Sequence, residues 1–229
     1  MSTLSAVRVA AKAEPAQQAM IIFHGLGDSG SGWSFLAEYI QRDLAFSKTR
    51  FIFPNAPTLS IVANGNYPMP AWFNIYSWGE DRSRVDNAGL MDSLKTVERF
   101  VTEQVTSGIR PENIIVGGFS QGAALALASA VTLPIKIGGF VAFSGFGGFE
   151  DALELQKKNM NLDSPIFHGH GDIDPIVSFS KGKDVYKQLT QRFKFSNFTF
   201  NSYPGLEHGT SPEELGDAIE FVKNIYLSQ

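Results

Sequence analysis

The chain has 229 residues, 43% of them hydrophobic, and a formal net charge of −4 at pH 7. A chain of this length can bury one sizeable core, and no Pro/Ser-rich linker or charge block divides it, so we expect a single domain over residues 1–229. The Lys and Arg residues are scattered, which argues against nucleic acid as a partner. The lack of cysteine excludes disulfides, a cysteine nucleophile and thiolate metal ligands.

The N-terminal segment 1–20 is interrupted by Arg8, Lys12 and Glu14, so it lacks the continuous apolar core of a signal peptide. No stretch of the chain offers the roughly 18 uncharged apolar residues that a transmembrane helix needs. We therefore expect a cytoplasmic protein without a signal peptide or a transmembrane segment.

Short apolar runs alternate with helical patterns along the chain. The runs that predict strands are 19–25, 50–56, 113–119, 137–145, 164–171 and 197–205. Apolar residues at three- and four-residue steps predict a helix over 88–108, and a Ser-Pro start predicts a closing helix over 211–229. Strands separated by helices indicate an α/β fold with a mostly parallel sheet and helices on both faces.

The pentapeptide Gly118-Phe119-Ser120-Gln121-Gly122 lies between an apolar run and an Ala/Leu-rich stretch. Gly-x-Ser-x-Gly between a strand and a helix is typical of the nucleophile elbow of α/β-hydrolases, so Ser120 is the predicted nucleophile. Such small-residue turns also occur without chemistry, and Ser120 would then only cap a buried helix.

A serine nucleophile needs a general base and an orienting carboxylate further along the chain. His208 is the only histidine after the acid region, and it lies in a Gly-rich loop before the last helix. Two aspartates follow the run that ends near Gly171. We favour Asp174 as the acid because Pro175 holds it in an extended conformation, whereas Asp172 suits a turn.

The oxyanion of the reaction needs backbone N–H donors, one of them from the residue after the nucleophile. Gln121 supplies this donor, and Leu26, after His24-Gly25, is the candidate for the second. Residues 25–30 also match the dinucleotide fingerprint, but no ribose-binding acid follows the next strand. His168 and His170 stand near two aspartates without a third ligand cluster, so we expect neither a metal nor a cofactor.

Several blocks of the sequence, in this order, resemble the acyl-protein thioesterase and lysophospholipase family of small serine hydrolases, above all its fungal members. The blocks are 23–33, 53–57, 69–75, 117–128, 137–146, 169–177 and the His208 loop. The resemblance implies an α/β-hydrolase fold without a separate cap domain. It also implies a serine esterase that removes palmitoyl groups from S-acylated proteins and acts on related esters such as lysophospholipids.

Matched position by position, the family pattern implies a triad of Ser120, Asp174 and His208 with the Leu26 and Gln121 amides as oxyanion donors. We further expect only transient contact with membrane surfaces, a monomer or weak homodimer, and the nucleus as a second compartment besides the cytoplasm. A broad carboxylesterase without a protein substrate is the alternative enzyme. A catalytically inactive binding module is the alternative from another class.

The stretch 63–78 is dense in aromatic residues, Pro and Gly. Because the family binds its acyl chain in an apolar channel near such a loop, we expect a channel formed by Met69, Trp72, Ile75, Tyr76 and Phe146. Burial in the core is the alternative, above all for Trp72 and its neighbour Phe73.

Two departures from the family pattern bear on this site. Asn74 stands where the family usually has Asp, which puts the anchoring of its loop in question. Glu207 and Gly209 flank His208 where a Met-containing pair and Ser or Thr are common, which leaves the contacts around this histidine open.

Overall fold

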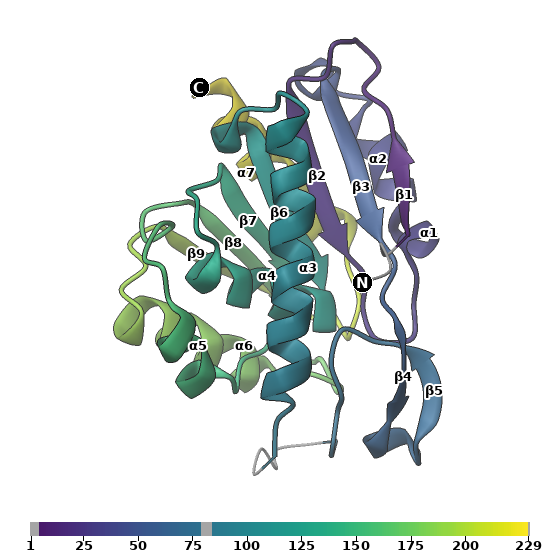
Figure 1. The fold of residues 1–229 in the computed structure, drawn as a ribbon, viewed down its shortest axis with the longest axis vertical. Coiled ribbons are helices and arrows are strands. Elements are labelled where there is room, and N and C mark those ends of the chain that lie inside the picture. Colours follow the sequence, from purple (N-terminus) through teal and green to yellow (C-terminus); the bar gives the residue numbers. More distant parts are fainter. Residues whose placement is uncertain (1–4, 79–83, 229) are drawn as a thin grey trace.

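The computed structural model describes residues 5–78 and 84–228. Seven strands form one sheet in the order β1–β3–β2–β6–β7–β8–β9 (Figure 1). Their bounds are Ala6–Val9 for β1, Gln18–Phe23 for β2, Thr49–Pro54 for β3, Ile114–Phe119 for β6, Gly139–Phe143 for β7, Ile166–Gly171 for β8 and Phe198–Tyr203 for β9. Strand β1 is antiparallel to β3, and all other neighbours pair in parallel. Each predicted apolar run overlaps one of the parallel strands, and β2 and β3 begin one residue before the predicted runs.

A second, two-stranded sheet lies beyond the carboxyl end of β3 (Figure 1). It consists of the antiparallel strands β4 (Thr58–Ile61) and β5 (Tyr67–Pro70). The sequence did not predict this hairpin, since two of the four residues of β5 are prolines, which cannot donate to a ladder.

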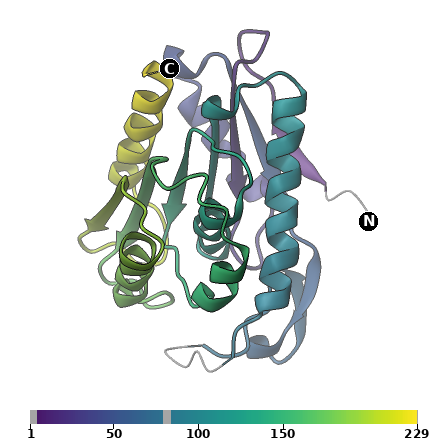
Figure 2. The same cartoon turned by 60° about the vertical axis from the view of Figure 1, so that its left-hand side comes forward.

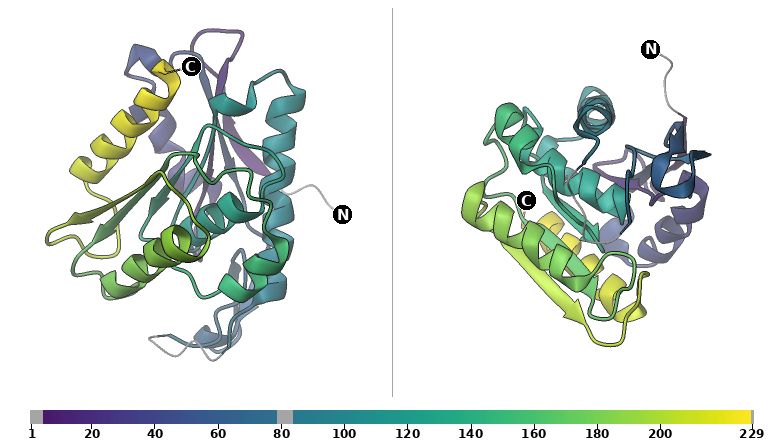
Figure 3. Two further views of the ribbon diagram at one scale, coloured as in Figure 1. Left: turned by 90° about the vertical axis from the view of Figure 1, so that its left-hand side faces the viewer. Right: turned by 90° about the horizontal axis from the view of Figure 1, so that it is seen from below.

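Helices cover both faces of the seven-stranded sheet (Figure 2 and Figure 3). One layer contains α3 (Asn87–Thr106), α4 (Gln121–Thr132), α5 (Glu150–Gln156) and α6 (Phe179–Lys187). The other contains α1 (Gly30–Trp33), α2 (Phe35–Ile40) and α7 (Pro212–Leu227). Short 3₁₀ helices cover Leu44–Phe46, Val62–Asn64 and Pro111–Asn113, and a π-helical turn covers Gln188–Arg192. The predicted α/β-hydrolase fold class is confirmed.

Helix α4 packs with almost no exposed surface against the centre of the sheet. Its sequence, QGAALALASAVT, consists mainly of small and aliphatic residues, and all of these except the last are buried. Small side chains let the helix axis approach the sheet closely, so α4 and the strand before it hold the turn between them in a rigid frame. Within the described ranges, no helix is both long and apolar enough to span a membrane.

Candidate active site

Ser120 occupies the sharp turn between β6 and α4 in an unusual backbone conformation, with φ 53° and ψ −113°. Only glycine fits two residues before it and two residues after it. A Cβ on Gly118 would lie 2.4 Å from a main-chain carbon of Gly122, and a Cβ on Gly122 would lie 2.0 Å from the main-chain oxygen of Phe23. The strained serine is held by Ser120 N–H donating to the Phe143 carbonyl (2.8 Å). This geometry is that of the predicted nucleophile elbow.

The three predicted triad residues form one hydrogen-bonded chain. His208 Nδ1 donates to Asp174 Oδ2 (2.7 Å), because a carboxylate can only accept. The neutral imidazole then leaves Nε2 unprotonated, and Ser120 Oγ donates to it over 3.0 Å. These side chains come from the loops after β8, β9 and β6, which end at the same edge of the sheet. The turn around His208 is tight, with Gly209 N–H donating to the Glu207 carbonyl (2.9 Å).

Asp174 is held as an ionised carboxylate by its own loop. Its Oδ1 accepts the N–H groups of Ile176 and Val177, both at 2.8 Å. Burial alone would raise the pKa of Asp174, but the hydrogen bond from His208 and these amides lower the pKa below its ordinary value. The other candidate, Asp172, is exposed and accepts the Gly205 N–H (2.7 Å), as expected of a turn residue.

His168 and His170 lie fully buried behind this loop. His170 Nε2 donates to the Val177 carbonyl (2.8 Å), and His168 Nε2 accepts the Gly145 N–H (3.0 Å). Burial lowers the pKa of both imidazoles, that of His168 strongly. The pair therefore stays neutral and links the loops after β7 and β8. Among the described residues, no group of three or more His, Cys, Asp or Glu could hold a metal ion.

In the described part of the chain, the main-chain N–H groups of Leu26 and Gln121, both near Ser120, have no acceptor. Gln121 is the first residue of α4, and Leu26 follows the end of β2, the neighbour of β6 in the sheet. Both residues line the same cavity as Ser120 and His208. The structure thus brings together the donors that an oxyanion hole requires.

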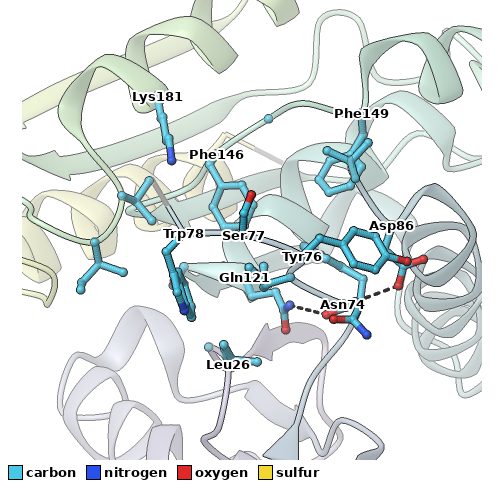
Figure 4. A pocket seen from close by; sticks show the side chains of 18 of the residues that line it. Leu26, Asn74, Tyr76, Ser77, Trp78, Asp86, Gln121, Phe146, Phe149 and Lys181 are labelled. Atoms are coloured by element: carbon cyan, nitrogen blue, oxygen red, sulfur yellow. Dashed lines mark hydrogen bonds between the residues drawn. The ribbon is translucent and has the colours of Figure 1, made fainter. Parts of the chain in front are cut away.

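An apolar cavity of about 330 Å³ adjoins the serine (Figure 4). Of the predicted channel residues, Ile75, Tyr76 and Phe146 line it. Met69 and Trp72 are not in its wall. Trp72 is only 1% exposed in the core, and the Met69 sulfur lies against Asn64 Nδ2 in the β4–β5 hairpin.

The cavity wall also contains residues that were not predicted as functional. They are mainly apolar or aromatic: Phe73, Trp78, Val85, Phe119, Phe149, Ile176 and Val177. Arg84 joins them, with its guanidinium 3.8 Å from the centre of the Tyr76 ring. Phe149, Ile176 and Val177 follow the ends of β7 and β8, and this position after a strand is the feature of the sequence that could have marked them as cavity residues. Arg84 and Val85 precede α3 and carried none.

Asn74 fixes the loop at the entrance to helix α3. Its Oδ1 accepts the Val62 N–H (3.0 Å), and its Nδ2 donates to the Ser60 carbonyl (2.9 Å). Its main-chain N–H donates to Asp86 Oδ2 (2.8 Å), the carboxylate that also caps α3 (Figure 4). An ionised aspartate at position 74 would have no donor for the Ser60 carbonyl, so this contact depends on the amide of Asn74.

Comparison with known proteins identifies the family. Residues 4–226 match the family described as Phospholipase/Carboxylesterase. The chain belongs to this family. It is 56% identical to the Kluyveromyces lactis protein named Acyl-protein thioesterase 1, covering 96% of each chain. It is 50% identical to the Saccharomyces cerevisiae protein of the same name, over 96% of this chain and 98% of that one.

Solved structures of similar proteins have the same architecture. Arabidopsis thaliana SOBER1 is 28% identical with a TM-score of 0.86, over 92% of this chain and 99% of that one. Zea mays acyl-protein thioesterase 2 is 26% identical with a TM-score of 0.79, over 97% and 99%. The resemblance noted from the sequence blocks is confirmed.

Proposed function

We propose that this protein is a serine hydrolase that cleaves thioester-linked fatty acyl groups, palmitoyl above all, from cysteines of acylated proteins. The observation that carries the proposal is the hydrogen-bonded chain Ser120–His208–Asp174 beside an apolar cavity of about 330 Å³. The names of the fungal relatives, each an acyl-protein thioesterase, support the same substrate class.

The first half of the proposed reaction transfers the acyl group to the enzyme. His208 Nε2 takes the hydroxyl proton as Ser120 Oγ attacks the thioester carbonyl, and Asp174 stabilises the imidazolium. The Leu26 and Gln121 amides donate to the oxygen that becomes negative. The C–S bond then breaks, the proton passes from His208 to the leaving sulfur, and Ser120 carries the acyl group as an ester.

Water completes the cycle by the same route. His208 removes a proton from the attacking water, and the tetrahedral intermediate collapses to release the fatty acid and regenerate the Ser120 hydroxyl. A thiolate leaves more readily than a serine alkoxide, so we expect deacylation to limit turnover. A chromogenic thioester should then show a pre-steady-state burst of one equivalent, and a linear trace would contradict slow deacylation.

The apolar cavity supplies binding energy through the acyl chain. Each buried methylene contributes about 0.8 kcal/mol, or roughly a fourfold change in kcat/KM. An acyl chain in this cavity would bind without contacts to the rest of the substrate. We therefore expect sharper selectivity for chain length than for the sequence around the acylated cysteine.

The decisive experiment compares a palmitoylated cysteine peptide with a short-chain ester. The thioester should be the better substrate by kcat/KM, and Ser120→Ala should abolish turnover of both. Full activity in Ser120→Ala would refute the serine mechanism. An active enzyme that prefers the short ester would instead indicate a broad carboxylesterase, in line with the family description.

A further inference from the structure

The two proposed oxyanion donors belong to separate elements, yet one oxygen atom must accept from both. Leu26 lies on the loop after β2, and Gln121 begins α4. A donor stabilises the transition state only when it lies within hydrogen-bond distance of the developing charge, so the separation of the two amides must be fixed. The residues that flank Leu26 and the side chain of Gln121 contact one largely buried stretch, Pro70–Phe73, which we name the 70–73 segment.

The 70–73 segment brackets the Leu26 peptide on both sides. On the side before it, Trp72 Nε1 donates to the His24 carbonyl (2.8 Å). On the side after it, Gly27 N–H donates to the Pro70 carbonyl (2.8 Å). The loop between these two anchors contains only Gly25 and Leu26, so its position follows that of the segment.

The same segment is clamped to the Gln121 side chain. Gln121 Oε1 accepts the Trp72 N–H (2.8 Å), and Gln121 Nε2 donates to the Phe73 carbonyl (2.7 Å). Gln121 and Trp72 are each 1% exposed, so water does not compete for these bonds. The Ser93 hydroxyl donates to the Trp72 carbonyl, which fixes the segment to α3 as well.

We propose that the Trp72 side chain and the Gln121 side chain are positioning residues that set the distance between the two oxyanion amides. The inference rests on the oxyanion assignment made under the proposed function. Trp72 is therefore not a wall of the acyl channel but a spacer between the two halves of the oxyanion hole. Because the oxyanion exists only in the transition state and the intermediate, disturbing the spacer should lower kcat and leave KM nearly unchanged.

The test measures Trp72→Phe with p-nitrophenyl butyrate, a short ester whose hydrolysis does not depend on a palmitoylated protein. Phenylalanine keeps an aromatic ring but removes the donor to the His24 carbonyl. We expect kcat per active site to fall roughly 10- to 100-fold while KM changes less than about threefold. The affinity of a boronic acid that forms a tetrahedral adduct with Ser120 should fall by the same factor as kcat/KM.

Tyr226→Phe is the matched control. It too removes a buried side-chain donor to a main-chain carbonyl, that of Ala19 at 3.4 Å, but at the far end of α7. Active-site titration counts only folded enzyme, so lost stability does not enter kcat. Gln121→Met, which breaks the second clamp, provides an independent variant if Trp72→Phe folds poorly.

The outcomes separate the two proposals. A per-site kcat of Trp72→Phe and Gln121→Met within about twofold of wild type, as expected for Tyr226→Phe, would overturn the spacer. A fall in kcat together with a rise in KM by the same factor would assign the 70–73 segment to substrate binding, and this result would also overturn the spacer proposal. A wild-type chain that hydrolyses neither this ester nor a palmitoylated cysteine peptide would refute the proposed function itself.

Discussion

The free energy of unfolding of the wild-type protein should fall as the pH rises from 5 to 8, and replacing Glu214 by glutamine should abolish this fall. Glu214 lies in the first turn of α7 and is fully buried, and neither carboxyl oxygen has a hydrogen-bond partner among the described residues. It faces Gly169 of β8, where a Cβ would lie 2.3 Å from the Glu214 Oε1. Burial raises the pKa of Glu214 to about 8 from its ordinary 4.5.

The sign of the effect follows from the protons bound in each state. Between pH 4.5 and pH 8, the folded chain keeps a proton on Glu214 that the unfolded chain has lost. The free energy of unfolding therefore falls as the pH rises, by about 1.4 kcal/mol per pH unit, or about 4 kcal/mol from pH 5 to pH 8. Well above pH 8 both states are ionised and this contribution no longer changes. Glutamine has nearly the same shape and does not titrate.

Urea unfolding of both proteins at pH 5, 6, 7 and 8 measures this difference directly. The stability of Glu214→Gln relative to wild type should grow with pH, with about 4 kcal/mol as the upper limit. The buried histidines contribute equally to both proteins and cancel. Glu213→Gln, an exposed change in the same turn, should leave the pH profile unchanged. A difference between Glu214→Gln and wild type that is constant from pH 5 to pH 8 would refute the reasoning.

Three further predictions concern the triad, the cavity and the elbow. Asp174→Asn should lower kcat for ester hydrolysis by about 10³- to 10⁴-fold, whereas Asp172→Asn, which keeps an acceptor for the Gly205 N–H of the turn, should remain active; equal losses would contradict the choice of acid. Phe146→Ala should move the optimum of an acyl-length series to longer chains, because Phe146 lines both the cavity and a smaller void of about 20 Å³; an unchanged optimum would argue against an acyl site there. Gly122→Ala should destabilise the fold by about 3 kcal/mol or more in thermal unfolding, since its Cβ would lie 2.0 Å from a main-chain oxygen. Gly216→Ala, at an exposed position of α7, should be neutral or stabilising.

Strands β2, β3, β6, β7 and β8 could be predicted because both of their faces are buried, which leaves continuous apolar runs in the sequence, whereas the parallel edge strand β9 is only partly buried. The edge strand β1 could not be predicted, since it has only four residues and one of them, Arg8, is charged and exposed. The β4–β5 hairpin was equally hidden, because Pro68 and Pro70 mark β5 as a loop rather than a strand. Local sequence predicts elements whose burial is uniform and misses those whose stability comes from their neighbours.

The placement of the proposed triad could be predicted because each residue follows a strand end, and these ends meet at one edge of the sheet. The role of Trp72 could not. A buried aromatic residue in the core and one that lines a cavity look alike in a single sequence, and its indole partner is 48 residues away at His24. The side chain of Gln121 was missed for the same reason, since both of its partners lie in the 70–73 segment.

Part of the cavity wall comes from a stretch of the chain that contains no residue of the proposed triad. Much of the apolar wall comes from residues 75–78 and 84–85, whereas Ser120, Asp174 and His208 follow strands of the main sheet. Mutations in these wall stretches can reshape the pocket without displacing a strand end. Substrate preference can therefore diverge among descendants of one gene while the bond-breaking chemistry is inherited intact.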